Sequence, residues 1–222
     1  METALRLAAL RRLGFTPMTA RPARDLGDTA VRVAVGALFL MLAQRLAAEF
    51  LRTGHVTGLL LLTSELLVVI LMVIRRPAAA VDRTWPARLI TAASMTGPPL
   101  LRTVSTSPMA DGWSAAISGF GLLLIVLGKL SLGRSFGLVP ANRGVVSSGL
   151  YRFVRHPIYA GYLVTHVGFC LAHPAWWNVL LLGASDAALL ARSWYEERTL
   201  GTDPAYAAYR ACVRWRIAPR LF

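Results

Sequence analysis

A short polar motif, Arg155-His156-Pro157-Ile158-Tyr159, has residue types that are able to bind a small molecule. Proline fits the first turn of a helix, where its missing N–H loses no hydrogen bond. The free N–H groups and the partial positive charge at such a helix start would attract a carboxylate. Tyr151 and Tyr159 flank the turn and could stack on a planar ring. The alternative is an interfacial anchor, because Arg, His and Tyr all favour the membrane boundary.

A second motif, Arg192-x3-Glu196-Glu197, ends the next apolar segment. Residues four apart share a helix face, so the first two side chains can form a pair that merely supports the helix. However, Arg ahead of Glu is the poorer order, and Glu near a helix C-terminus opposes the helix dipole. A cationic ligand explains the carboxylate better. Asp203-Pro204 then predicts the start of a short helix that carries Tyr206, Tyr209 and Arg210 and folds back over the site as a lid.

The composition places these motifs in a membrane protein. The 222 residues are 55% hydrophobic and 16% charged, with 24 Lys+Arg against 11 Asp+Glu and a net charge of +13. Soluble domains carry about 25% charged residues. A nucleic-acid-binding module would not reach a mean hydropathy of +0.53, and the same hydrophobicity excludes disorder. We therefore expect no nucleic-acid partner, and a lipid bilayer around the protein.

Apolar segments predict an all-α, polytopic membrane helix bundle of about six transmembrane helices, with five as the alternative. A helix needs about 20 apolar residues to cross a bilayer. The third candidate is interrupted by Thr96-Gly97-Pro98-Pro99, and the last two are separated only by Ala172-His173-Pro174, which predicts a tight helical hairpin. The candidate spans are 29–49, 55–74, 87–106, 112–131, 158–173 and 175–195.

The basic residues predict the orientation of this bundle. Twenty of the 24 fall on one side if six helices alternate, whereas five spans would scatter them. The positive-inside rule then places both termini in the cytoplasm. Residues 1–28 form a basic N-terminal segment that is not a signal peptide, and that is either an interfacial amphipathic helix or a loose tail. The Arg- and Ala-rich composition favours a bacterial source, and hence the inner (plasma) membrane.

Three regions follow from this pattern. Residues 1–28 are the basic segment, residues 29–127 are a variable scaffold of four transmembrane helices, and residues 128–222 contain both polar motifs. The motifs lie on the predicted cytoplasmic side. We therefore expect a cytoplasmic cofactor pocket built from the C-terminal half of the chain.

The two motifs, in this order and at this separation, resemble those of the isoprenylcysteine carboxyl methyltransferase and phospholipid methyltransferase family of integral membrane enzymes. The resemblance covers about residues 128–219. It implies methyl transfer from S-adenosyl-L-methionine, with Glu196 holding the cofactor's amino group and Arg192 facing the acceptor. It also implies that the cofactor pocket is lined by Arg143, Gly144, Val145, Val146, Tyr151, Arg155, His156, Pro157, Ile158 and Tyr159.

The methyl acceptor stays open between a carboxylate, an amine and a thiol on a lipid-embedded or small hydrophobic molecule. Transfer from a sulfonium mainly needs alignment and exclusion of water. A carboxylate needs no base, and Arg192 could orient it. An amine or thiol would first lose a proton to Glu197, Tyr159 or water. Relatives of the isoprenylcysteine type have a polar residue near Val139-Pro140-Ala141, where this chain is apolar. The catalytic candidates are therefore Arg192, Glu196 and Glu197.

Two other function classes are weighed against methyl transfer. Membrane sterol and 5α-steroid reductases, which use NADPH, carry a similar Arg-His-Pro-x-Tyr stretch, but they typically have Glu where this chain has Tyr162. A non-catalytic scaffold or transporter is the other alternative, although the polar residues cluster at one mouth and form no midplane track.

The remaining polar residues have less specific interpretations. Glu65 and Asp186 lie within predicted spans, where ionisable side chains are often functional or else bonded to a neighbouring helix. His166 is expected in an interhelical hydrogen bond. Four scattered histidines predict no metal site. The two cysteines, Cys170 and Cys212, are expected as free thiols, and the oligomeric state stays open.

Overall fold

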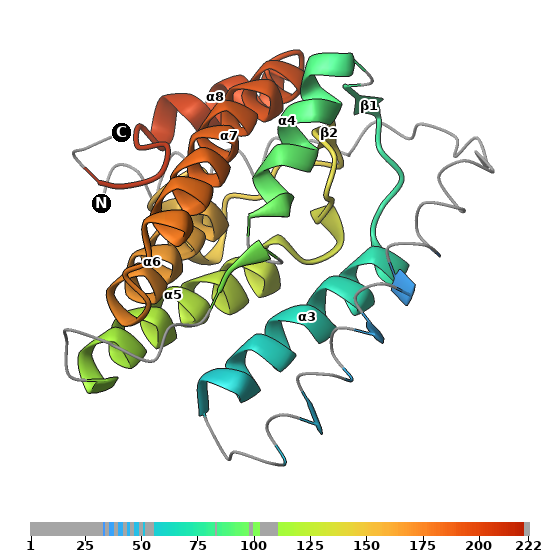
Figure 1. Cartoon of the computed structure of the whole chain (residues 1–222). Coiled ribbons are helices and arrows are strands. Elements are labelled where there is room, and N and C mark those ends of the chain that lie inside the picture. The colour runs from blue at the N-terminus through green and yellow to red at the C-terminus, as the bar shows by residue number, and fades with distance from the viewer. Residues whose placement is uncertain are drawn as a thin grey trace.

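A computed structural model describes residues 56–82, 84–97, 100–102 and 111–219, with isolated residues between 33 and 51. The predicted segment 1–28 and most of the first predicted span lie outside the described residues. Helices dominate the described part (Figure 1), with α3 at Val56–Ile74, α4 at Trp85–Thr96, α5 at Asp111–Leu132, α6 at Pro157–Ala172, α7 at Trp176–Leu200 and α8 at Pro204–Cys212.

Short elements connect the ends of these helices. Two 3-10 turns, η2 at Gly133–Ser135 and η3 at Gly149–Arg152, lie between α5 and α6. Strand β1 at Ala80–Val81 pairs antiparallel with β2 at Ala141–Asn142, and Ala80 lies opposite Asn142. The prediction of a helical protein is confirmed, but this strand pair was not predicted, since two residues show no measurable alternation.

Four predicted spans coincide with helices. Segments 55–74, 112–131 and 158–173 match α3, α5 and α6 to within a residue, and α7 extends five residues past the predicted end at 195. The third prediction, 87–106, is wrong in its length because α4 ends at Thr96. Two prolines follow Gly97 in the sequence, and proline has no N–H to continue a helix.

Consecutive helices from α3 to α7 alternate in direction. The backbone N–H of Arg76 donates to the carbonyl oxygen of Arg134 (2.7 Å), so α3 and α5 end at the same place. At the opposite end, the N–H of Arg102 donates to Oδ1 of Asn178 (3.0 Å), so the chain after α4 reaches the start of α7. We call the end of the bundle at which α3, α5 and α7 finish the pocket end.

Small residues let α5 and α6 approach closely. A Cβ at Gly121 would lie 2.7 Å from the carbonyl oxygen of Gly161, and one at Gly168 would meet Ser118. Membrane helices commonly use small residues in this way, because van der Waals contact replaces the hydrophobic effect in lipid. Around this contact, the buried core joins α3, α5, α6 and α7 through Val68, Leu71, Met72, Leu122, Ile125, Ile158 and Leu189. The predicted α6–α7 hairpin is confirmed.

The surface of the bundle is strongly apolar. Ile70, Val73, Phe120 and Leu130 are each more than half exposed, which suits contact with lipid better than contact with water. Among the residues described, one helix, Gly112–Ser135, is long and apolar enough to cross a membrane, with a mean hydropathy of 2.0. The shorter α6 is also apolar. The six-span and five-span arrangements stay predictions.

Candidate active site

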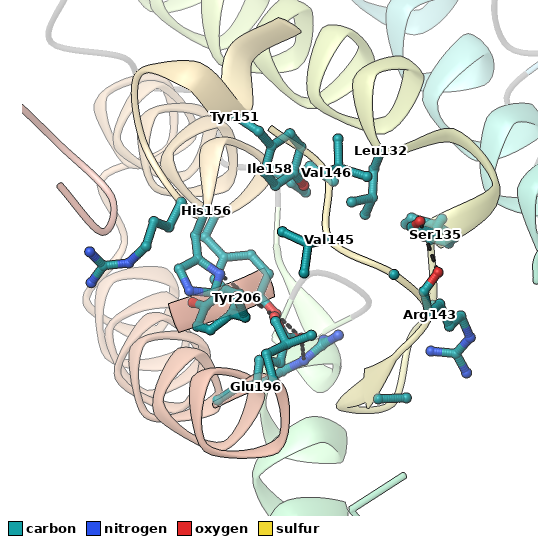
Figure 2. Close-up of a pocket in the computed structure, with 18 of the residues that line it drawn as sticks. Leu132, Ser135, Arg143, Val145, Val146, Tyr151, His156, Ile158, Glu196 and Tyr206 are labelled. Atoms are coloured by element: carbon teal, nitrogen blue, oxygen red, sulfur yellow. Dashed lines mark hydrogen bonds and ion pairs between the residues drawn. The ribbon is translucent and has the colours of Figure 1, made fainter. Parts of the chain in front are cut away.

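The pocket end of the bundle holds an open cavity. Residues of the α5–α6 connection form one wall, and α6, α7 and α8 supply the others (Figure 2). Apolar side chains dominate the first wall, namely Leu132, Phe136, Leu138, Val139, Val145 and Val146.

The wall from residues 141 to 146 is held in place by hydrogen bonds. Gly144 has a φ of 95°, which an L side chain rarely adopts. Its N–H donates to Oδ1 of Asn142 (3.0 Å), and Ser135 Oγ donates to the carbonyl oxygen of Arg143 (3.1 Å). Asn142 Nδ2 donates to Oδ2 of Asp203 (2.9 Å), which ties this wall to the start of α8.

The start of α6 is built as the sequence predicted. Pro157 occupies the first turn of α6, after His156 in a non-helical conformation. The N–H groups of Arg155 and His156 donate to the carbonyl oxygens of Trp215 (2.9 Å) and Arg216 (2.8 Å). The C-terminal segment therefore fixes the orientation of this turn. His156 and Tyr159 stack with their ring centroids 5.2 Å apart.

Glu196 lies in the pocket with two donors on one oxygen. Tyr159 Oη donates to Oε1 of Glu196 (2.5 Å), and Arg192 Nε donates to the same atom (3.1 Å). The other oxygen, Oε2, lies 3.6 Å from Nδ1 of His156. The predicted i,i+4 pair between Arg192 and Glu196 is thus formed, and it explains the role of Oε1 as helix support. In the described structure the His156 ring nitrogen is the polar atom near Oε2, so Oε2 is the oxygen best suited to a ligand ammonium.

Glu197 lies outside the pocket lining, in a buried cluster with two arginines and a histidine. Its carboxylate accepts from Arg155 Nε (2.8 Å), from Arg216 Nη2 (2.9 Å) and from His156 Nε2 (3.2 Å). Burial alone would raise the pKa of Glu197, but the hydrogen bonds from His156, Arg216 and Arg155 outweigh it and hold the pKa well below its ordinary value. A carboxylate so hard to protonate is a poor proton acceptor, so its placement favours a positioning role over the predicted catalytic one.

The structure brings most of the predicted site residues together. Of the predicted cofactor residues, Pro157 is packed behind the turn and is not part of the lining. Of the predicted catalytic residues, Arg192 and Glu196 line the cavity. The predicted residues that form the lining are Arg143, Gly144, Val145, Val146, Tyr151, Arg155, His156, Ile158, Tyr159, Arg192 and Glu196.

Several lining residues were not among the predicted set. Tyr162 and Leu200 line the cavity, and so do Tyr206 and Tyr209 of α8. Tyr209 Oη donates to the carbonyl oxygen of Tyr151 (2.7 Å), which fastens α8 over the pocket. The sequence did indicate the two α8 tyrosines, because the predicted lid helix carries them. The predicted start of this helix is confirmed, since Oδ1 of Asp203 accepts from the N–H of Ala205 (2.9 Å).

The other polar residues lie elsewhere. His166 Nδ1 and Asp186 Oδ1 are 2.6 Å apart, so the interhelical bond expected for His166 is formed between α6 and α7. Cys170 and Cys212 are free thiols. The side chain of Glu65 lies outside the described ones. In the described part of the chain, no three His, Cys, Asp or Glu side chains come together as potential metal ligands.

Comparisons with known proteins agree with the motifs. Residues 116–202 match the family model of phospholipid methyltransferase. A protein-S-isoprenylcysteine O-methyltransferase A of Arabidopsis thaliana is 39% identical over 64 residues, which are 23% of this chain and 32% of the relative. The match thus covers about a third of the length of that relative. No solved structure matches the chain.

The matched segment contains most of α5 and all of α6 and α7, and it supplies most of the polar residues of the pocket lining. The segment also includes both predicted motifs. These findings confirm the predicted resemblance of the C-terminal part of the chain to the phospholipid and isoprenylcysteine methyltransferases.

Proposed function

We propose that the protein transfers a methyl group from S-adenosyl-L-methionine to a lipid-embedded or small hydrophobic acceptor at a membrane surface. The observation that carries this proposal is the position of Glu196, a carboxylate inside a largely apolar cavity. The family of the C-terminal part supports methyl transfer in general. The reductase alternative has no support from these comparisons.

The residues present fit this cofactor. Its amino group is a cation, and Glu196 lines the cavity with Oε2 near the His156 ring nitrogen among the described residues. The Tyr151 ring, the aliphatic side chain of Ile158 and the valines of the opposite wall offer apolar surface for a planar base. The cofactor, when bound, supplies an electrophilic methyl group on a sulfonium.

The protein's own contribution is orientation and exclusion of water. Arg192 is 6% exposed and lies with its Cζ 5.5 Å from the Tyr159 ring centroid, so its guanidinium has a fixed direction in the cavity. Such a guanidinium is suited to orient an anionic acceptor. Glu197, which would serve a protonated acceptor as a base, is committed to hydrogen bonds with two arginines and His156. This arrangement favours an acceptor that is already ionised, such as a carboxylate.

The test is binding and turnover by purified protein in lipid nanodiscs. Glu196→Gln is expected to weaken S-adenosyl-L-methionine binding by about 10- to 100-fold, since a hydrogen-bonded charge contributes on the order of 1.5–3 kcal/mol. Asp82→Asn, outside the pocket, is the matched control and should bind as the wild type does. Mass spectrometry of lipid extracts incubated with labelled cofactor identifies the acceptor.

Two results would contradict the proposal. A wild-type protein that binds NADPH but not S-adenosyl-L-methionine would assign it to the reductases. An unchanged cofactor affinity in Glu196→Gln would remove Glu196 from the site.

A further inference from the structure

One polar group in the pocket has no partner in the described structure. The Tyr206 side chain is 3% exposed, and its hydroxyl is buried without a hydrogen bond. Buried hydroxyls are almost always hydrogen-bonded, because an unpaired one has lost its water without compensation. The neighbouring hydroxyl of Tyr209 is satisfied by the carbonyl oxygen of Tyr151. The Tyr206 hydroxyl therefore needs a partner that the described residues do not supply, such as a bound ligand.

The position of this ring is fixed. Tyr206 packs in a buried cluster with Tyr209 and Val213, and its ring centroid lies 5.8 Å from that of Tyr209. Asp203, three residues before Tyr206, caps the first turn of α8. Figure 2 draws Tyr206 in the part of the pocket that also holds His156 and Glu196. The hydroxyl is thus a preorganised group and not a mobile side chain.

The surroundings define what the hydroxyl can bind. Burial raises the pKa of Tyr206 above its ordinary value, and Glu197 adds to this effect, while Arg155 and Arg210 oppose it. The hydroxyl therefore keeps its proton at neutral pH and acts as a donor. A carboxylate is the strongest acceptor for such a donor, and the two arginines provide positive charge in its vicinity.

Glu196 indicates where that carboxylate comes from. If an amino-acid group places its ammonium on Glu196, its carboxylate is attached to the same carbon atom and lies close by. The cavity thus offers an acceptor for the cation and a buried donor for the anion of one zwitterion. Methyl transfer at this site requires a ligand that carries such a group.

We propose that Tyr206 is a cofactor-binding residue whose hydroxyl donates a hydrogen bond to the α-carboxylate of S-adenosyl-L-methionine. The inference rests on the proposed function, because it identifies the zwitterion as the amino-acid end of the methyl donor. It also gives α8 a purpose, since the bond would hold this helix closed over the occupied pocket.

The test compares two ligands that differ only in the carboxylate. Affinities for S-adenosyl-L-methionine and for its decarboxylated form are measured by calorimetry on the wild type and on Tyr206→Phe in nanodiscs. The variant should bind S-adenosyl-L-methionine about 10- to 100-fold more weakly and bind the decarboxylated form as the wild type does. Tyr195→Phe, the same change outside the pocket lining, should leave both affinities unchanged.

Stability of the ligand-free protein provides an independent readout. Removing an unpartnered hydroxyl should leave the melting temperature of Tyr206→Phe equal to or above that of the wild type. Tyr209→Phe, which loses a real hydrogen bond, should melt at a lower temperature.

The outcomes separate this inference from the function on which it rests. A Tyr206→Phe variant that binds S-adenosyl-L-methionine normally would overturn the inference, and so would an equal loss for both ligands, because the hydroxyl would then touch another part of the cofactor. A variant that unfolds would show that the hydroxyl has a structural partner, which also overturns it. A wild type that fails to bind S-adenosyl-L-methionine would instead refute the proposed function.

Discussion

Two adjacent glutamates at the end of α7 have opposite surroundings. Glu196 points into the cavity, and Glu197 points into a cluster of Arg155, His156 and Arg216. His156 lies between the two, with Nδ1 toward Glu196 and Nε2 toward Glu197. Glu197 therefore acts on the pocket through the position of the histidine ring.

Glu197→Gln is expected to destabilise the protein and to weaken cofactor binding as a consequence. Breaking a buried charge pair costs about 3–5 kcal/mol, because the remaining charges stay buried without compensation. Thermal unfolding in detergent measures the loss. Arg198→Gln, an exposed change one residue away, should melt as the wild type does. Equal melting temperatures for Glu197→Gln and the wild type would contradict the role of the cluster.

The same carboxylate predicts the pH dependence of stability. The pKa of Glu197 is lower in the folded protein than in the unfolded chain, so its contribution is fully present above the ordinary glutamate pKa of about 4.3 and is lost as the pH falls toward the folded value. The difference in melting temperature between wild type and Glu197→Gln should be constant near neutrality and shrink in acid. A difference that grows in acid would show that another group dominates.

At the scale of elements, one side chain couples the pocket wall to the lid. Asn142 accepts from the N–H of Gly144 and donates to Asp203, the residue that caps α8. The wall and α8 thus share one hydrogen-bonded connection, which bridges 61 residues of sequence. Movement of α8 would change the shape of the wall at the same time.

Asn142→Ala is expected to loosen α8 and lower cofactor affinity. Two hydrogen bonds are lost, each contributing about 1 kcal/mol net. Hydrogen exchange of α8 should rise, and calorimetry should show weaker binding. Asn178→Ala is a matched control, because Asn178 joins the chain after α4 to α7 at the opposite end of the bundle. It should lower the melting temperature yet leave the affinity and the exchange of α8 unchanged.

The sequence predicted elements better than it predicted their partners. Long apolar runs such as 112–131 located α5, since the pattern of a helix is local. The end of α4 at Thr96 was also visible in the sequence, in the Gly97-Pro98-Pro99 run, but the expected span length outweighed it. Glu196 and Glu197 differ in their surroundings, and the Tyr206 hydroxyl is unpartnered, because of how α6, α7 and α8 contact one another. These helices are distant in sequence. No local pattern reports such contacts.

At the scale of the whole molecule, helix direction and charge agree. The alternation from α3 to α7 brings to the pocket end most of the basic residues that the topology argument placed on one side. Arg76 and Arg134 follow α3 and α5 at this end, Arg152 lies in η3 and Arg210 in α8. Arg102 lies at the opposite end beside Asn178. Although α4 has only 12 residues, the chain from β1 through Arg102 runs from one end of the bundle to the other (Figure 1). This geometry favours six spans over five.

Cysteine labelling tests this topology directly. In a background with Cys170→Ser and Cys212→Ser, single cysteines replace the exposed residues Arg76, Pro174 and Arg210. With six spans, a membrane-impermeant maleimide should reach Arg76→Cys and Arg210→Cys from the cytoplasmic side, and Pro174→Cys from the other, because basic segments stay inside. If the connection through α4 did not cross the bilayer, Arg76→Cys and Arg210→Cys would react from opposite sides. That result would restore the five-span alternative. It would also place the ends of α3 and α5 on different faces of the membrane, and the hydrogen bond between Arg76 and Arg134 does not allow this separation.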